Sequence, residues 1–263
     1  MNRKFVFIIF GTVLLATSLF FLRFKIWRTT DLEGGQYDLE NITKPIFSSS
    51  TTTETEKGEN TAKLPLYKGR DPQEFKPDPN VVNSFTDQQK TQLSDDIKKY
   101  GEMVSSQPEY ASAWLQVGLL KQVIGDYIGT RDAWEYVALT RPKEQVAFKN
   151  LADLYWRYLL DNAKAEYNFK KAISLKPEDI STYIDFAEFY GLSGKNELAL
   201  SILKQGLAAN PESLDLIKAI ASFYDRQKDY QQALDWWQKA LEKYPDDDGI
   251  SQMIEEIKEK MSK

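Results

Sequence analysis

The chain of 263 residues contains no cysteine and no histidine. The absence of cysteine excludes disulfides and thiol chemistry, and it leaves the redox compartment open. The absence of histidine removes the commonest general base and the commonest metal ligand. We therefore predict that the protein is not an enzyme and uses no metal and no cofactor. An enzyme that relies on Asp and Glu alone is the last-ranked alternative, because no carboxylate pair stands out.

The sequence also lacks an excess of basic residues. It has 34 Lys and Arg against 39 Asp and Glu, which gives a net charge of -5. A chain without bulk positive charge offers no general surface for a phosphate backbone. We expect no nucleic-acid partner, and we expect no small-molecule substrate.

One segment near the N-terminus has no charge at all. It runs from Phe5 to Leu22, and at about 1.5 Å per residue it spans about 27 Å, close to the thickness of the hydrocarbon core. We predict an N-terminal transmembrane signal anchor over residues 1–28. A cleaved signal peptide is the alternative, because Ala16 and Ser18 form a small-x-small pair after a short apolar core.

Basic residues lie on both sides of this segment. Arg3 and Lys4 precede it, and Arg23, Lys25 and Arg28 come after it, so the positive-inside rule does not favour export of the C-terminal part of the chain. An N-terminal anchor with a basic start usually keeps its tail inside and exports the rest of the chain. On that ground we expect a single-pass membrane protein whose folded domain lies on the extracytoplasmic side.

The segment after the predicted anchor is polar and rich in helix breakers. A tract reading SSSTTTETEKGENT is followed by prolines at positions 65, 72, 77 and 79. Such composition disfavours helices and strands. We predict a disordered Ser/Thr/Pro-rich linker over residues 29–85. The alternative is that its aromatic part, around Leu66, Tyr67 and Phe75, docks on a folded surface.

The remainder of the chain has an internal period. Prolines occur at positions 108, 142, 177, 211 and 245, so their spacings are 34, 35, 34 and 34. Between successive prolines, an apolar helical stretch, a polar turn and a second apolar helical stretch recur in that order. Apolar residues three and four positions apart in each half predict two helices per repeat. The sequence therefore predicts an all-α fold.

Residues at fixed positions within this period resemble the tetratricopeptide repeat (TPR) family. The fourth repeat carries the pattern most closely, through Ile217, Ala221, Tyr224, Tyr230, Ala233, Trp237, Ala240 and Pro245. The first repeat departs from the pattern at Lys121 and Thr130, and the third departs at Leu203 and Gly206. The second has one extra residue in its turn, around Leu160 to Asn162.

The resemblance covers residues 109–245 and implies a right-handed α-solenoid of about four helix-turn-helix units. The units are predicted at 111–144, 145–179, 180–213 and 214–247. Small residues are expected where the paired helices approach closely, at Gly118, Ala152, Ala187 and Ala221. In this register Trp237 takes the aromatic core position of Trp134 and Phe169, so we predict that it packs inside, and that Trp236 leans on a neighbouring helix.

The ends of such an array need covers. One unit cannot offset the cost of ordering its own residues by burying its own side chains, so terminal units need a packing partner. Upstream, Thr86 and Gln89 form a capping-box pattern before an apolar stripe, which predicts a capping helix over 86–108. Downstream, an acidic start and an apolar stripe predict a second capping helix over 248–263.

The resemblance also implies a concave groove, lined by the first helix of each unit, that binds an extended peptide or a helix of another protein. Its groove-facing positions are Leu115, Leu119, Gln122, Lys149, Asp153, Trp156, Ile184, Glu188, Lys218, Ser222 and Asp225. Family members that grip a C-terminal carboxylate use lysine followed four residues later by asparagine. Here Lys149 is followed by Asp153 and Lys218 by Ser222, which disfavours that mode. Trp156 is the leading candidate for a ligand contact.

Anchor, linker and repeats together predict a membrane-tethered protein-protein interaction module, acting as a scaffold or an assembly factor. Its expected partners are other proteins, and its contact with the membrane is through the N-terminal helix. The alternative is a structural or self-associating spacer whose groove holds no ligand.

Overall fold

The computed structural model describes residues 64–262. All regular secondary structure in this part of the chain is helical. The helices are α3 (Pro79–Val82), α4 (Asp87–Ser106), α5 (Ala111–Val123), α6 (Tyr127–Thr140), α7 (Gln145–Arg157), α8 (Asn162–Leu175), α9 (Ile180–Leu192), α10 (Asn196–Ala209), α11 (Leu214–Arg226), α12 (Tyr230–Lys243) and α13 (Asp248–Met261).

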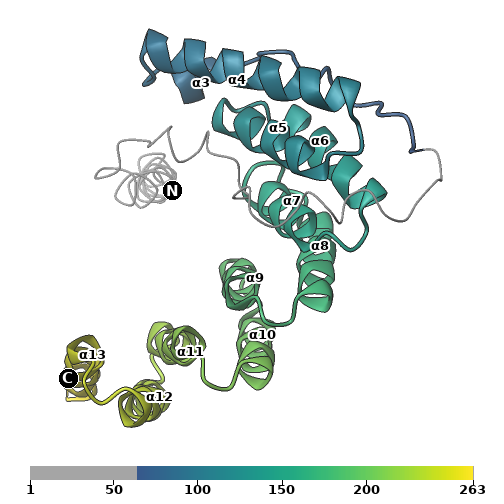
Figure 1. Cartoon of the computed structure of the whole chain (residues 1–263). Coiled ribbons are helices and arrows are strands. Elements are labelled where there is room, and N and C mark those ends of the chain that lie inside the picture. Colours follow the sequence, from purple (N-terminus) through teal and green to yellow (C-terminus); the bar gives the residue numbers. More distant parts are fainter. Residues whose placement is uncertain (1–63, 263) are drawn as a thin grey trace, which may run out of the picture. The chain divides into compact units, whose positions relative to one another are not determined.

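Helices α5 to α12 form four successive pairs, which Figure 1 shows one after another along the chain. Within each pair the two helices pack on one another, and the second helix also contacts the first helix of the next pair. First helices of neighbouring pairs touch as well, as α7 with α9 and α9 with α11. This order of contacts confirms the predicted all-α solenoid of helix pairs.

The turn inside each pair has one residue in the left-handed backbone conformation, directly before the N-cap of the second helix. One residue with positive φ stands at the corresponding place in all four turns: Gly125, Leu160, Gly194 and Lys228. Glycine adopts this left-handed conformation without a steric cost, whereas leucine and lysine do so at some cost. The second pair has its extra residue in this turn, since α5 and α7 are equally long but α8 begins one position later in the period.

The core repeats along the chain with its predicted residue types. The second helix of each pair buries one large side chain at the same position, namely Trp134, Phe169, Leu203 and Trp237. Trp237 is only 4% exposed, which confirms that it packs inside. Trp236 is partly buried against the same cluster, and the Nζ of Lys239 lies 4.2 Å from the centre of its ring. The adjacent tryptophans are therefore part of the architecture.

Two glycines allow large rings to approach a helix backbone. A β-carbon at Gly118 would collide with the indole ring of Trp134, whose Nε1 donates to the Leu115 carbonyl over 3.1 Å. A β-carbon at Gly206 would lie 2.7 Å from the Tyr183 ring. Gly206 breaks the alanine pattern of the family because Tyr183 needs that space.

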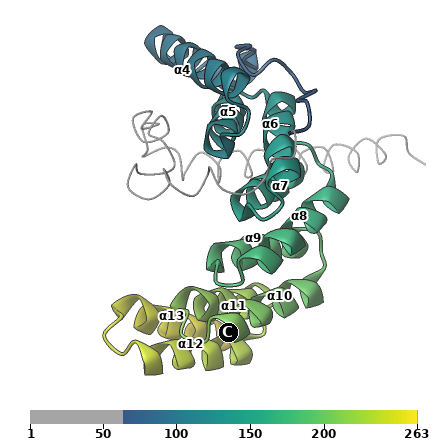
Figure 2. The ribbon, with the colours of Figure 1, turned by 45° about the vertical axis from the view of Figure 1, so that its right-hand side comes forward.

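Helices α4 and α13 lie at the two ends of the paired helices. Thr86 and Gln89 form the expected reciprocal cap at the start of α4, with hydrogen bonds of 2.8 and 3.2 Å. Helix α13 packs its buried Ile250, Ile254 and Ile257 in one cluster with Trp237. Figure 2 shows α13 beside α11 and α12.

The predicted disordered linker is wrong over its described part. Residues 64–78, which we call the strap, lie against α4, α5 and α6, and α3 follows directly. The N–H of Asp78 donates to the carbonyl of Ile124 over 2.8 Å. Val82 and Phe85 are buried. The composition predicted disorder because it disfavours helices and strands. The main-chain groups of the strap instead form hydrogen bonds with residues of the helices and of the turn between α5 and α6.

The predicted anchor over residues 1–28, the rest of the predicted linker up to residue 63, and residue 263 lie outside the described residues. Within residues 64–262, no helix combines the length and the apolar character needed to cross a membrane.

Candidate functional site

The predicted groove residues lie on the first helices of the four pairs, α5, α7, α9 and α11. We call the side of these helices that carries them the first-helix face. Leu115 is only 1% exposed and belongs to the core, so its prediction as a peptide contact is wrong. The other predicted residues are partly exposed: Leu119, Gln122, Lys149, Asp153, Trp156, Ile184, Glu188, Lys218, Ser222 and Asp225.

Charged residues of the first-helix face connect α7 to α9. The Nζ of Lys149 hydrogen-bonds the hydroxyl of Ser181 and lies 3.5 Å from a carboxylate oxygen of Asp179. Arg157 joins Asp153 on its own helix, at 2.5 Å, to Glu188 on α9, at 3.2 Å. Three of the predicted ligand contacts, Lys149, Asp153 and Glu188, therefore also hold neighbouring pairs together.

Asp179 is the structural centre of the first of these connections. Although its burial opposes the effect, hydrogen bonds from Ser181, Thr182 and Gln145, together with the charge of Lys149, lower the pKa of Asp179 to about 2. The Nε2 of Gln145 reaches Asp179 from the start of α7 over 2.8 Å. Asp179 is thus kept ionised as a junction between the second and third pairs.

Trp156 is held by aromatic and cationic neighbours while part of it stays exposed. Its ring meets Phe169 and Phe189 edge-on, with centroid distances of 6.2 and 6.0 Å. The guanidinium of Arg157 lies 3.7 Å from the centre of the Trp156 ring, a separation typical of a cation–π contact. A ligand reaching this ring would meet an indole fixed in one orientation.

Asp185 is a site residue that sequence reasoning missed. It lies on α9 near Lys149, Asp153, Arg157 and Glu188. Burial raises the pKa of Asp185, and the nearby carboxylates add to that effect while Lys149 and Arg157 oppose it. Within residues 64–262 it has neither a hydrogen bond nor an ion pair, unlike its neighbours. The only feature of the sequence that could have indicated Asp185 is its position next to Ile184, one of the residues predicted to contact a partner peptide.

Near the C-terminal end, charged residues of the first-helix face pair with α13. Lys218 of α11 pairs with Asp247, the N-cap of α13, at 2.9 Å. Asp225 of α11 pairs with Lys260 of α13 at 2.8 Å. Helix α13 thus takes the place of a further first helix.

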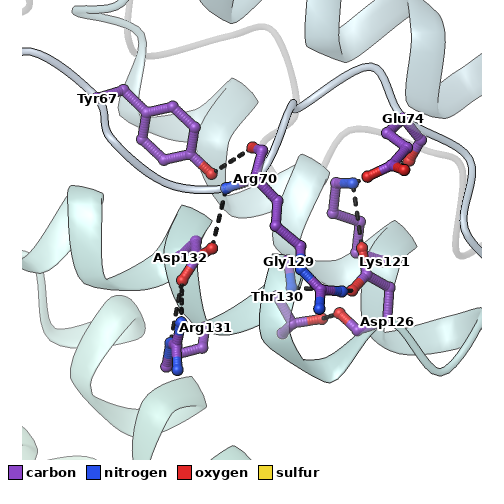
Figure 3. Close-up of polar contacts among 9 residues, drawn as sticks. All are labelled: Tyr67, Arg70, Glu74, Lys121, Asp126, Gly129, Thr130, Arg131 and Asp132. Atoms are coloured by element: carbon purple, nitrogen blue, oxygen red, sulfur yellow. Dashed lines mark hydrogen bonds and ion pairs between the residues drawn. The ribbon is translucent and has the colours of Figure 1, made fainter.

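A second polar cluster lies on the first helix pair, beneath the strap (Figure 3). Asp126, the N-cap of α6, has a fully buried side chain. It accepts hydrogen bonds from the Gly129 N–H at 3.0 Å, from the Nζ of Lys121 at 3.2 Å and from Arg70 of the strap at 2.6 Å. Lys121 is also fully buried. Buried charges persist when they are paired and hydrogen-bonded in this way.

The main chain of the strap is held by residues of the helices. The Tyr136 hydroxyl donates to the Pro65 carbonyl over 3.0 Å, and the Arg70 N–H donates to Asp132 over 2.9 Å. Farther along, the Nζ of Lys121 donates to the Glu74 carbonyl over 2.9 Å. Together with the bond between Asp78 and Ile124, these contacts hold the strap along its length.

Tyr67 is the aromatic anchor of the strap. Its ring centre lies 4.4 Å from that of Trp114 and 5.4 Å from that of Tyr136, the latter in an edge-to-face arrangement. Its hydroxyl donates to the carbonyl of Arg70 over 2.9 Å. Burial, followed by the charges of Asp132 and Asp126, raises the pKa of Tyr67.

The sequence did carry a signal for this cluster. Lys121 and Thr130 are the positions where the first repeat departs from the family pattern, and both are fully buried. Lys121 bonds the strap, and the Thr130 hydroxyl donates to the carbonyl of Asp126 over 3.0 Å. A polar residue at a core position of a repeat therefore marked an additional segment packed on that repeat.

Comparison with known proteins supports the repeat interpretation. Residues 192–256 match the profile of a family described as "Tetratricopeptide repeat". This match spans α10 to α12 and part of α13. No curated protein sequence matches the chain significantly.

The chain is also similar to several solved structures. MamA is 18% identical, with a TM-score of 0.50, over 60% of this chain and 92% of that one. A thermophilic TPR protein from Thermus thermophilus is 18% identical over 64% and 91% of the two chains, with a TM-score of 0.45. YrrB, described as a TPR protein with an unusual peptide-binding site, is 19% identical over 66% and 87%, with a TM-score of 0.46. The likeness to MamA supports the solenoid fold.

Proposed function

We propose that the protein is a membrane-tethered protein-protein interaction module, which binds a peptide or helix of a partner on the first-helix face. The supporting observation is the surface around α7 and α9, where Trp156 is partly exposed and oriented by its neighbours. Next to it, the Asp185 carboxylate forms no hydrogen bond or ion pair within residues 64–262, although paired charges surround it. Tetratricopeptide repeats generally mediate binding to other proteins, which fits this surface.

The full-length protein, purified from its membrane fraction after cross-linking in cells, tests this proposal. We expect Trp156→Ala to remove a cross-linked partner protein that the unchanged protein retains, because the substitution takes away the oriented ring. The matched control is Tyr167→Ala, which removes a 63% exposed aromatic ring from α8, outside the first-helix face. Equal recovery of every partner by the two variants would contradict binding on this face.

The tether is proposed from the uncharged segment between Lys4 and Arg23, and the folded domain is proposed to lie on the extracytoplasmic side. Replacing Leu14 and Leu15 with arginine should release the protein from membranes at alkaline pH, because two charges in the hydrocarbon core are costly. Retention of this variant to the same extent as the unchanged protein would argue against the anchor.

The absence of cysteine makes the orientation easy to measure. A single cysteine at the exposed Ser251 gives the protein one reactive thiol. We expect a membrane-impermeant maleimide to label it in intact cells. Labelling only after the cells are lysed would place the domain on the cytoplasmic side.

The alternative role is a spacer or self-associating protein without a ligand on the first-helix face. It is favoured by one observation, the pairing of Lys149, Asp153 and Glu188 within the chain. Sedimentation of the full-length protein in detergent distinguishes the two roles. Concentration-dependent self-association that Trp156→Ala leaves unchanged, with no cross-linked partner, would support the spacer.

A further inference from the structure

The strap lies on a surface that differs from the same surface of the other pairs. Positions 132 and 136 of α6, which hold the strap, correspond to Tyr167 and Lys171 of α8. Tyr167 is 63% exposed, whereas the Asp132 side chain is 11% exposed. The cap residue Asp126 is fully buried, while its counterpart in the second pair, Asp161, has a side chain that is 39% exposed. The first pair thus carries contacts for an additional segment that the second pair lacks.

Three strap residues, Tyr67, Gly69 and Arg70, make contacts that depend on their residue type. Tyr67 fits between Trp114 and Tyr136, and Arg70 reaches the buried Asp126 carboxylate. Between them, a β-carbon at Gly69 would collide with the ring of Tyr67 and with the side chain of Asp132 on α6. These contacts select an aromatic ring, a glycine and an arginine in the order Tyr-x-Gly-Arg.

On the other side of the strap, α4 contacts the main chain of the strap directly. A β-carbon at Gly101 of α4 would lie 2.8 Å from the main-chain nitrogen of Gln73. The lack of a side chain there lets the strap approach α4 directly. A larger residue at position 101 would block the site without altering any of its charges.

We propose that the face formed by α4, α5 and α6 is a peptide-binding site separate from the first-helix face, occupied here by the chain's own strap. Its ligand is an extended segment of the form Tyr-x-Gly-Arg, and the strap exchanges with the same segment supplied in trans. Exchange is feasible because the empty site keeps its charge balance: Lys121 and Asp126 pair directly with one another at 3.2 Å. The bound strap is also partly exposed, with Leu66 at 80%.

Release of the strap would lengthen the connection to the N-terminal region. Residues 64–78 would leave the helices, and at up to about 3.5 Å per residue they would add up to about 50 Å of chain. The site would then control how far the helix pairs reach from whatever holds the N-terminus. This consequence rests on the proposed tether, whereas the binding site itself does not.

The test measures binding of a fluorescent peptide with the sequence of residues 64–78 to the full-length protein by anisotropy. Arg70→Ala in the protein weakens its own strap and should open the site. We expect this variant to bind the peptide at least 10-fold more tightly than the unchanged protein, whose strap competes. A peptide carrying Arg70→Ala should bind the opened protein at least about 30-fold more weakly, because it cannot form the ion pair that Arg70 makes with the buried Asp126 carboxylate.

Two further variants keep the result decisive. Gly69→Ala in the protein displaces the strap sterically and should open the site without removing a charge. Gly101→Val, added to either opened protein, should abolish binding of the peptide. Equal binding of the native and Arg70→Ala peptides, or no gain on opening, would overturn the proposal. It would also be overturned if both opened proteins lost their helical circular dichroism, because the strap would then be a fixed part of the fold.

Discussion

The first and fourth helix pairs are covered in different ways. The fourth pair is covered by α13, whose isoleucines pack on Trp237 in a continuous apolar cluster. The first pair is covered by α4 and, in addition, by the strap, whose Arg70 pairs with the buried Asp126, which also pairs with the buried Lys121. Apolar packing is tolerant of its partner, whereas a buried ion pair demands particular groups at particular places. The C-terminal cover therefore requires only apolar side chains of suitable size, whereas the N-terminal cover requires particular residues at particular positions.

The N-terminal cover also explains the composition of the strap. A helix such as α13 buries an apolar stripe of its own, which the sequence reveals as periodicity. The strap has no such stripe, and its binding depends on four main-chain hydrogen bonds and a few side chains. The sequence of such a segment therefore predicts a linker, because its contacts with the helices are not visible in the sequence.

The largest expected effect is at the buried cluster of the first pair. Asp126→Ala should lower the free energy of unfolding by about 3 to 5 kcal/mol, because it leaves the buried ammonium of Lys121 without a carboxylate partner and removes a helix cap. Asp229→Ala, which removes the corresponding cap of the fourth pair, should cost only about 1 kcal/mol. Urea unfolding, with hydrogen exchange of the α6 and α12 amides, measures both. Equal losses would mean that the two covers do not differ in kind.

At the other end, Ile257→Ala should cost about 2 to 4 kcal/mol through the cavity it leaves beneath α13. This loss should be almost independent of salt, since no charge is involved. Met261→Ala, at a residue that is 44% exposed on the same helix, should change stability by less than about 0.5 kcal/mol. Urea midpoints at low and high ionic strength provide the measurement, and a salt-dependent loss would contradict an apolar cover.

A smaller effect is expected where the two pairs differ by one methyl group. Gly118→Ala should destabilise by about 1 to 3 kcal/mol, because the added carbon collides with Trp134. In the fourth pair the same position is Ala221, which is buried. Ala221→Gly should cost about 0.5 to 1 kcal/mol, mainly through backbone entropy. Thermal unfolding monitored by circular dichroism ranks the two, and a stabilising Gly118→Ala would show that the Trp134 contact is not tight.

The smallest expected effect is a loss of stability at low pH, at Asp179 between the second and third helix pairs. The pKa of Asp179, lowered to about 2, lies below the value of about 3.9 expected in the unfolded chain. Its contribution to stability is therefore complete above about pH 4 and is lost as the pH falls toward 2. After allowance for solvent screening we expect about 1 kcal/mol. Urea titrations at pH 4.5 and 2.5 should show a smaller decline for Asp179→Asn, and an identical decline would exclude this carboxylate as a cause.

Much of the helical architecture could be predicted because its causes are local and repeated. The proline period placed the turns, the apolar spacing set two helices per repeat, and the alignment of repeats identified Trp237 as a core residue. The extra residue near Leu160 was also visible, since it shifts the period by one. The individual groove positions were harder to predict. The burial of Leu115 depends on how neighbouring helices pack against it, which the repeat pattern does not specify. Asp185 was missed because the pairing of the charges around it depends on the tertiary structure.

The sequence by itself determined the helix pairs, their register and their small and aromatic core positions, because a period of 34 residues and a helical apolar spacing are properties of the chain alone. Only the tertiary structure decided that residues 64–78 belong to the fold. Their contacts join groups about 30 to 70 positions apart, as Gln73 with Gly101 or Pro65 with Tyr136, and pairings over such distances leave no periodic trace. The unusual Lys121 marked the place, but the reason for a buried lysine there became clear only from its hydrogen bond to the strap.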